Sequence, residues 1–292
     1  LKAAAGGGGI GMKIVPGIDQ LETLFLQAKS EAKKSFNDDT IYMEKYLEKP
    51  RHIEIQIFGD GKGKAVHLGE RDCSLQRRHQ KVLEETPSPG VDPSEIKKIG
   101  KICANAISKM KYEGAGTIEF LYENNEFFFI EMNTRLQVEH PITEAVFGID
   151  LVKEQISVAY GMGMSLSQEH LEPKGHAIEC RINAERLPNF SPSPGNIKEF
   201  HSPGGIGIRM DSAIYNGFRV PPYYDSLIGK LIVHGDSRSI ALGRLSRALD
   251  ELIIDGVYTT VDLFKDILDQ ADFKNGDYNI HWLEQWLSDQ VQ

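Results

Sequence analysis

The sequence has few cysteines and no arrangement of them that suggests a metal site or a disulfide framework. Its three cysteines, Cys73, Cys103 and Cys180, are scattered, odd in number and free of any Cys-x-x-Cys spacing. This pattern argues against a structural zinc site and favours a reducing compartment, which we expect to be the cytoplasm. Long apolar runs are also absent: none approaches the roughly 20 residues that cross a bilayer, and no signal-peptide pattern opens the chain.

A surplus of positive charge is missing as well. The 292 residues contain 33 Lys and Arg against 42 Asp and Glu, for a net charge of −9. So acidic a chain is poorly suited to nucleic acid, and it must hold any anionic substrate through local clusters of Lys, Arg and Gly. An initiator methionine is lacking too: Leu1 and Lys2 are followed by three alanines and then by the glycines. We therefore expect a piece of a longer protein, cut at its N-terminus, with one to three domains.

The most informative stretch is a predicted β-hairpin. Two strand-like runs, Gly116–Tyr122 and Glu126–Asn133, flank a polar turn at Glu123–Asn125. Side chains alternate along a strand, so one face of the second run is expected to hold Phe127, Phe129, Glu131 and Asn133. The hairpin would place Glu119 opposite Phe129 and diagonally across from Glu131, roughly 7 Å away at the backbone.

Two carboxylates this close repel each other unless a positive group lies between them. Magnesium would resolve the conflict, because it takes one or two carboxylates and fills its other positions with water and substrate phosphates. Asn133 offers a neutral oxygen ligand on the same face, and Arg135, Gln137 and Glu139 follow on alternate positions. A solvated sheet face is the alternative, which the neighbouring phenylalanines disfavour.

Residues 6–11, GGGGIG, form a loop whose backbone amides can approach a phosphate closely. A dinucleotide-binding loop requires a helix to begin at the glycines, but residues 12–15 are typical of a short strand. The first helix is expected only from Asp19, with a capping box of Asp19 and Glu22. A P-loop is excluded because Met12 stands where lysine is required. A glycine hairpin lying over phosphates and a flexible linker both remain open.

Periodicity predicts the remaining elements. Apolar alternation predicts strands over residues 41–47, 51–58, 175–183 and 231–234. Helical periodicity predicts helices over residues 96–110, 142–146, 151–160, 239–252 and 260–268, and a closing helix with Trp282 and Trp286. Residues 71–81 carry a dense basic run, which indicates either a solvated face or a locally built anion site.

Motifs in a fixed order carry a family resemblance. From the N-terminus they are Lys2 before the glycine loop, MEKYLEKPRHIEIQ, ERDCSLQRRHQK, GAGTIEF, FIEMNTRLQVEHPITE, ECRINAE and VPPYYDSLIGKL. The chain resembles, along essentially its whole length, the ATP-grasp core and C-terminal region of biotin carboxylase. Among these enzymes it is most similar to the free-standing subunit of bacterial acetyl-CoA carboxylase.

The resemblance implies an α+β protein with an ATP-grasp fold, an antiparallel sheet flanked by helices, followed by the biotin carboxylase C-terminal region. The implied domains are a partial lid subdomain over residues 1–46, a core with the metal and bicarbonate site over 47–174, and the C-terminal region over 175–292. The family's N-terminal Rossmann-like domain and the first part of its lid are missing, with one lysine that contacts ATP.

The implied reaction has two steps and opens fatty acid synthesis. ATP phosphorylates bicarbonate to carboxyphosphate, and the carboxyl group then passes to a ring nitrogen of biotin. Because the chain has no biotin-attachment sequence, the biotin would be presented by a separate biotin carboxyl carrier protein. Carboxyltransferase subunits are further implied partners, as is a second copy of the chain, bound through surface such as Arg209.

The resemblance also implies residue roles at the nucleotide. Lys2 and the amides of Gly8 and Gly9 would cover the phosphates. Magnesium or manganese would be held by Glu119 and Glu131, with Asn133 near them. The adenine, ribose and pocket walls would come from Glu44, Lys45, Tyr46, Leu47, His52, Gln76 and His79.

The implied bicarbonate site lies further along the chain. Bicarbonate would sit against Lys81, Arg135, Gln137 and the backbone N–H of Val138. Glu139 would be the base that removes its proton. Arg181, together with Arg135, would stabilise the negative charge that develops on the ureido oxygen of biotin, since a guanidinium offers paired hydrogen bonds.

Four alternatives stay open. In the first, Arg135 and Glu139 form a structural ion pair, and in the second Arg181 is a surface residue. In the third, the chain is a catalytically impaired fragment that only binds ligands, and in the fourth it is another ATP-grasp ligase that activates a carboxylate, of the carbamoyl-phosphate synthetase type.

Overall fold

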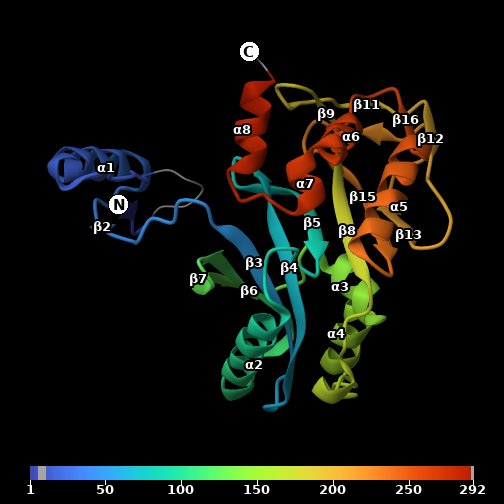
Figure 1. Ribbon diagram of the computed structural model, residues 1–292, viewed down its shortest axis with the longest axis horizontal. Coiled ribbons are helices and arrows are strands. Elements are labelled where there is room, and N and C mark those ends of the chain that lie inside the picture. The colour runs from blue at the N-terminus through green and yellow to red at the C-terminus, as the bar shows by residue number, and fades with distance from the viewer. Residues whose placement is uncertain (6–10, 291–292) are drawn as a thin grey trace. The chain divides into compact units, whose positions relative to one another are not determined.

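The computed structural model describes residues 1–5 and 11–290. The chain divides into two compact units, each described by itself (Figure 1). The first contains Leu1–Lys49 together with Arg78–Gln80, and the second contains Pro50–Arg77 and Lys81–Gln292. No helix in the described part of the chain is both long and apolar enough to cross a membrane.

The first unit is a small helix-and-ribbon structure. Strand β1 (Lys2–Ala3) pairs antiparallel with β2 (Ile41–Tyr42). A 3-10 turn, η1 (Ile18–Gln20), leads into helix α1 (Leu21–Phe36). Two small residues of the helix, Ala28 and Ala32, are completely buried, which lets the helix backbone lie close to the ribbon.

Three expectations for this unit are wrong. The capping box of Asp19 and Glu22 is absent, because η1 takes Asp19 into its own turn and the helix starts at Leu21 without a side-chain cap. The strand expected over residues 41–47 ends at Tyr42, since β1 offers only two residues to pair with. The strand expected over 12–15 is reduced to one bridge between Met12 and Lys2. The glycines of the predicted phosphate loop, except Gly11, lie outside the described residues.

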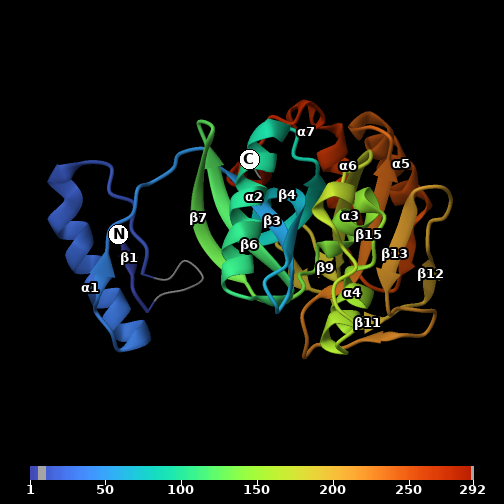
Figure 2. The same ribbon diagram turned by 90° about the horizontal axis from the view of Figure 1, so that it is seen from below.

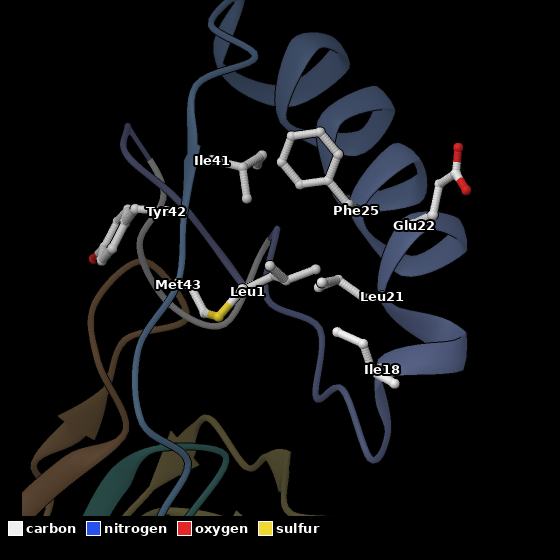
Figure 3. Close-up of a pocket in the computed structure, with 8 residues that line it drawn as sticks. All are labelled: Leu1, Ile18, Leu21, Glu22, Phe25, Ile41, Tyr42 and Met43. Atoms are coloured by element: carbon white, nitrogen blue, oxygen red, sulfur yellow. The ribbon is translucent and has the colours of Figure 1, made fainter.

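An apolar groove of about 420 Å³ runs between α1 and β2 (Figure 3). Phe25 of the helix faces Ile41 across it, and Leu21 faces Leu1. Among the described residues of this unit, the buried apolar side chains are Ala3, Ala28, Ala32 and Leu47. Because most of these are small, the first unit leaves much of its larger apolar surface uncovered.

The second unit is built on one eight-stranded sheet, ordered β13-β15-β8-β5-β4-β3-β6-β7. Figure 2 follows this sheet from β7 and β6 through β3 and β4 to β15 and β13. The described strand pairings within it are antiparallel. The strands are β3 (Arg51–Asp60), β4 (Ala65–Arg77), β5 (Gln80–Thr86), β6 (Glu113–Glu123), β7 (Glu126–Asn133), β8 (His176–Asn183), β13 (Ile208–Ser212) and β15 (Leu227–Gly235).

Helices cover this sheet, which confirms the predicted α+β class. They are α2 (Pro93–Lys109), α3 (His140–Phe147), α4 (Leu151–Ala159), α5 (Arg238–Glu251), α6 (Val261–Asp269), α7 (Ala271–Asn275) and α8 (Trp282–Asp289). Short elements fill the connections: η2 (Gln168–His170), β9 (Glu185–Arg186), β10 (Ser191–Pro192), β11 (Gly195–Asn196), β12 (Glu199–His201), β14 (Arg219–Val220) and β16 (Ile253–Asp255). All predicted helices of this unit are present. Helix α7 escaped prediction because five residues are too few to show a helical period.

The two faces of β3 bury different kinds of side chain, apolar on one face and polar on the other. Ile53, Ile55 and Ile57 are completely buried in a core that also contains Cys103 and Ile107 of α2. The alternate side chains, beginning with His52, point to the other face, since neighbours along a strand point in opposite directions. These polar side chains are nevertheless almost completely buried. The polar face of β3 is therefore enclosed and differs from a solvated sheet face.

A β-bulge corrects the predicted hairpin register. The turn is one residue shorter than predicted, Asn124–Asn125, so Glu123 pairs with Glu126, and the register then shifts between Glu119 and Phe120. Glu119 consequently pairs directly with Glu131 instead of Phe129, which lies opposite Phe120. The extra residue, Ile130, also separates Phe129 from the face of Glu131, so the predicted four-residue face is wrong. Bulges change side-chain direction in this way because side-chain alternation has a period of two.

A buried carboxylate, Glu85 of β5, joins the sheet to the C-terminal helices. It accepts hydrogen bonds from Arg238 of α5 at 2.7 and 3.0 Å, from His176 of β8 at 2.6 Å and from Tyr278. Burial raises the pKa of Glu85, but the bonds from His176 and Arg238 outweigh it and lower that pKa to about 2. Glu85 is thus a charged anchor between distant parts of the chain.

The charge of Glu85 predicts a pH-dependent contribution to stability. Its folded-state pKa lies below the ordinary value of 4.5, so its contribution is complete above about pH 4.5 and is lost as the pH falls toward 2. We expect Glu85→Gln to lower the free energy of unfolding by about 3 kcal/mol at pH 7. Denaturant unfolding at pH 7 and pH 3 measures this, with the exposed Glu172→Gln as control. A deficit that is equally large at both pH values would contradict the prediction.

Candidate functional site

A row of charged side chains crosses four strands on the polar face of the sheet. Arg71 of β4 is the register partner of Glu54 on β3, and Glu54 is the partner of Glu119 on β6. Glu119 in turn is the partner of Glu131 on β7. Directly paired residues point to the same face, so antiparallel pairing alone brings these four side chains together.

Arg71 is the most enclosed member of the row, with no exposed surface. It donates to Glu54 at 2.5 Å and also to four neutral side chains: Gln56 at 2.5 Å, Thr143 at 2.9 Å, Gln137 at 3.0 Å and Thr117 at 3.2 Å. Burial lowers the pKa of Arg71, but the charge of Glu54 outweighs it, and the net shift is upward. The guanidinium therefore stays charged and fixes the segment that contains Gln137.

Lys81 of β5 joins three carboxylates. Its Nζ lies 2.5 Å from Glu54, 2.8 Å from Glu119 and 2.7 Å from Glu139. Burial lowers the pKa of Lys81, yet these carboxylates raise it well above its ordinary value. A single ammonium thus holds together groups from β3, β6 and the segment before α3.

The same ion pairs keep the carboxylates ionised. Burial raises the pKa of Glu54, but Arg71 and Lys81 outweigh it and lower that pKa to about 2. Burial also raises the pKa of Glu119, and here the hydrogen bond from His52 and the charge of Lys81 bring it well below its ordinary value. Both groups are therefore anionic at neutral pH and able to ligate a cation.

The tautomer of His52 follows from its partner Gln76. The amide nitrogen of Gln76 donates to Cys73 O at 2.8 Å and lies 2.9 Å from Nδ1 of His52. Nδ1 is then an acceptor, so Nε2 carries the proton and faces Glu119 at 3.2 Å. His52, Glu54 and Glu119 lie close enough together for a metal ion. A protonated Nε2, however, has no free lone pair for a metal.

Glu119 and Glu131 are better suited to a metal. They are directly paired across β6 and β7, and the amide nitrogen of Asn133 bridges them at 3.1 and 3.2 Å. Glu131 is exposed, so one side of the pair is open to water and phosphate. Two carboxylates with open positions fit magnesium or manganese. Asn133 turns its nitrogen toward the carboxylates, while its oxygen accepts from Arg135 at 3.3 Å.

The predicted bicarbonate residues fall into two groups: Gln137 and Glu139 are buried, whereas Arg135 is exposed. Gln137 donates to Glu119 at 2.8 Å, and Glu139 lies between Lys81 and Arg181 of β8, which donates to it at 2.9 Å. Arg135 is exposed and donates to the carbonyl of Leu136 as well as to Asn133. Its described hydrogen bonds do not include Glu139, so the structural ion pair that we considered is not formed.

Arg181 is largely buried, which contradicts the alternative that it is a surface residue. Its side chain is 18% exposed and bonds to Glu84 of β5 at 2.6 Å as well as to Glu139. Beside it, Lys230 of β15 donates to the carbonyl of Val138 at 2.8 Å. These contacts fix both sides of the short segment from Gln137 to Glu139.

Several predicted nucleotide residues belong to the first unit and are described within it. Lys2 lies 3.5 Å from Glu44 and 5.9 Å from the ring of Tyr42. Lys45 and Tyr46 are exposed, whereas Leu47 is buried. His79 is exposed in the turn between β4 and β5, where it and Arg78 both have positive φ. Gly8 and Gly9 lie outside the described residues.

Arg209, the residue expected at a dimer surface, is 43% exposed and bonded within its own chain. It pairs with Asp211 at 2.8 Å and with Glu144 at 2.7 Å.

Sequence reasoning assigned no role to three residues of this cluster. Glu54 alternates with isoleucines, Arg71 opens a basic run, and Glu84 follows it closely. A charged residue that alternates with branched apolar residues is a usable signal, because a strand with one buried face and one charged position needs a partner for that charge. Identifying the partner requires the strand register.

Known protein families and curated proteins resemble this chain over nearly its whole length. Residues 1–168 match the family model "Carbamoyl-phosphate synthase L chain, ATP binding domain", and residues 179–285 match "Biotin carboxylase C-terminal domain". The chain is 56% identical over 287 residues to the biotin carboxylase of Haemophilus influenzae, covering 98% of this chain and 64% of that protein. It therefore spans about 64% of the length of this curated relative.

Solved structures give the same result. A biotin carboxylase–β-γ-ATP complex from Campylobacter jejuni has a TM-score of 0.89 at 48% identity, covering 97% of this chain and 64% of that one. The biotin carboxylase domain dimer of a Hydrogenobacter thermophilus 2-oxoglutarate carboxylase contains MgADP, ADP and bicarbonate. It has a TM-score of 0.88 at 44% identity, covering 97% of this chain and 63% of that one. These similarities support the ATP-grasp fold inferred from the sequence.

The five donor bonds of Arg71 predict a large and specific loss of stability on substitution. Lysine keeps the charge, but its compact ammonium cannot reach partners on both sides of the planar guanidinium. We expect Arg71→Lys to lower the free energy of unfolding by about 3 kcal/mol. Arg219→Lys, at an exposed position, is the matched control and should change it by less than about 0.5 kcal/mol. Equal effects of the two substitutions in denaturant unfolding would show that the buried network contributes little.

Proposed function

The chain belongs to the biotin carboxylase family, and from this premise we propose that it catalyses ATP-dependent carboxylation of biotin with bicarbonate. The observation that carries the proposal is Lys81, whose ammonium joins Glu54, Glu119 and Glu139 beside Arg181. Such a cluster can hold a small anion next to a carboxylate base and next to a metal-binding pair.

The nucleotide and its metal would occupy the edge formed by β6 and β7. Glu119 and Glu131 would hold magnesium or manganese, with Asn133 beside them, and the bound metal would neutralise the phosphate charge. His52 and Gln76 would form part of the nucleotide pocket. The remaining proposed contacts come from the first unit: Lys2, Gly8, Gly9, Glu44, Lys45, Tyr46, Leu47 and His79.

Bicarbonate would bind where Lys81, Gln137 and Glu139 converge. It would accept from Lys81 and Gln137, from the backbone N–H of Val138 and from Arg135 after that exposed side chain turns inward. Glu139 would remove its proton, because a carboxylate within hydrogen-bond reach is a competent base. The resulting oxygen nucleophile would attack the γ-phosphate of ATP and form carboxyphosphate, with ADP as the leaving group.

Biotin would approach from the side of Arg181. Its ureido oxygen would become negative as the ring nitrogen gives its proton to the departing phosphate, and a guanidinium positioned beforehand would stabilise that charge until the nitrogen bonds to the carboxyl carbon. Arg181 donates through Nε and Nη2, and no described residue accepts from Nη1, which supports this role.

Partners and location follow as further parts of the proposal. A biotin carboxyl carrier protein would present the biotin, and carboxyltransferase subunits would use the product, for acetyl-CoA in fatty acid synthesis. A homodimer is supported by the dimeric Hydrogenobacter domain, which is similar to this chain. Three buried cysteines without disulfides suit a reducing cytoplasm.

A second candidate is a ligase that activates a different carboxylate, as the carbamoyl-phosphate synthase description of the first family model suggests. Carboxylation of free biotin separates the two candidates, because an enzyme of the second type would not use biotin as an acceptor. A chain that binds ligands without turnover is the remaining alternative.

The base assignment predicts a clean separation of binding from chemistry. Glu139→Gln keeps the shape of the side chain but removes its proton-accepting charge, so bicarbonate-dependent ATP cleavage should fall at least 100-fold, in line with the typical contribution of a general base. Nucleotide binding should remain nearly intact. Both are measured in a chimaera that adds the N-terminal segment of the Haemophilus enzyme, with Glu126→Gln as the exposed control. Unchanged turnover in Glu139→Gln would exclude the assignment.

A further inference from the structure

Two buried glutamates behind Arg181 have no role in the mechanism above. Glu84 of β5 and Glu179 of β8 are register partners, and neither has any exposed surface. Three of their carboxylate oxygens, Oε2 of Glu84 and both oxygens of Glu179, have no hydrogen-bond partner among the described residues. Buried polar groups are normally bonded, so this pair requires an explanation.

Charge balance gives the first part of the explanation. Arg181 is the cation that bonds directly to the pair, through Oε1 of Glu84, and it is shared with Glu139. Lys230 donates to a backbone carbonyl, and Lys81 is engaged by three other carboxylates. Two adjacent buried anions would therefore face too little positive charge, and one of them must hold a proton.

Burial raises the pKa of Glu84 to about 7, and burial together with the charge of Glu84 raises the pKa of Glu179 well above its ordinary value. Glu179 is the member without a cation at hydrogen-bond distance, so the proton belongs there. Glu84, which bonds to Arg181, is the member that carries the negative charge once the pH exceeds about 7.

The geometry of Arg181 gives the second part. Its Nε lies 2.6 Å from Glu84, and Nη2 lies 2.6 Å from the same oxygen and 2.9 Å from Glu139. Glu84 thereby fixes the rotation of the planar group, and Nη1 is left without an acceptor among the described residues. A planar fork held along one edge presents its other edge in a fixed direction.

We propose that Glu84 is a positioning residue, held charged by a protonated Glu179, which aims the free edge of Arg181 at the ureido oxygen of biotin. The proposal rests on the proposed function only in its last step, the identity of the ligand. The sharing of one proton and the orientation of Arg181 can be tested without catalysis.

Catalysis tests the positioning step in the chimaera described above. Glu84→Gln removes the charge that anchors Arg181, so the KM for free biotin should rise roughly tenfold, while the KM for ATP should change little. In the unaltered chimaera, the KM for biotin should fall as the pH rises through about 7, because Glu84 loses its proton there. Glu84→Gln should remove that part of the pH dependence. The exposed Glu169→Gln is the control.

The groups that surround Glu84 constrain this reading of the pH profile. They are Lys81 on its own strand, Glu139 before α3, Glu179 and Arg181 on β8, and Lys230 on β15. Glu139 is the proposed base, so an effect exerted through it would change kcat. A change confined to the KM for biotin therefore reports on Glu84. A biotin KM and pH profile in Glu84→Gln that match the unaltered chimaera would overturn the proposal.

Two measurements stand apart from activity. The folded-state pKa of Glu179 lies above its unfolded-state pKa, so the folded protein binds a proton that the unfolded chain releases. The free energy of unfolding therefore falls as the pH rises above about 4.5. Glu179→Gln, the neutral analogue, should therefore gain stability relative to the unaltered chain between pH 5 and pH 8, and a loss would overturn the proton assignment. The Nε–H NMR signal of Arg181, identified by Arg181→Lys, should be protected from exchange and should lose protection in Glu84→Gln.

These experiments distinguish a failure of the proposed function from a failure of the positioning role of Glu84. If the unaltered chimaera does not carboxylate biotin, the proposed function fails, while the stability and NMR measurements still test the pair. If it carboxylates biotin and the NMR signal of Arg181 is unchanged in Glu84→Gln, the positioning role fails and the function stands.

Discussion

Charge buried inside a sheet must be paired, and this constraint governs the second unit of the protein. Arg71 has no exposed surface and Lys81 very little, so each is stable only because carboxylates and amides surround it. Those partners come from β3, from β6 and from the segment before α3. Pairing two cations thus fixes the relative positions of distant parts of the chain, including Gln137 and Glu139. The rigidity of the candidate site and the stability of the fold have the same origin.

Antiparallel register converts this chemistry into a defined geometry. A row of direct partners places Arg71, Glu54, Glu119 and Glu131 at increasing distance from the centre of the sheet. The cations lie at the inner end, and the outer pair of carboxylates reaches an open edge. A single bulge on β7 completes the outer pair, since without it Glu131 would point away from Glu119. An anion site and a metal site can then lie side by side without cancelling each other.

Much of this could be predicted from the sequence, and the failures have definite causes. Alternation and the turn at Glu123–Asn125 predicted the hairpin, and the motifs indicated Glu119, Glu131 and Glu139. The bulge at Ile130 left no signal, because an extra residue in a strand of mixed apolar residues does not change its composition. The basic run from Arg71 could be a surface or a site, and only the register shows that Arg71 faces Glu54. The strand predicted over residues 41–47 is too long, because strand propensity does not indicate whether a neighbouring strand is available for pairing.

The central claim is tested most directly by ADP release with magnesium, measured with and without bicarbonate and free biotin. We expect the chimaera that carries the added N-terminal segment to release ADP in a reaction that depends on bicarbonate and is faster with biotin. The same dependence in the chain alone would show that the added segment is dispensable for the chemistry. ADP release that depends on neither bicarbonate nor biotin in the chimaera would contradict the proposed function, because the cluster around Lys81 would then serve a different reaction.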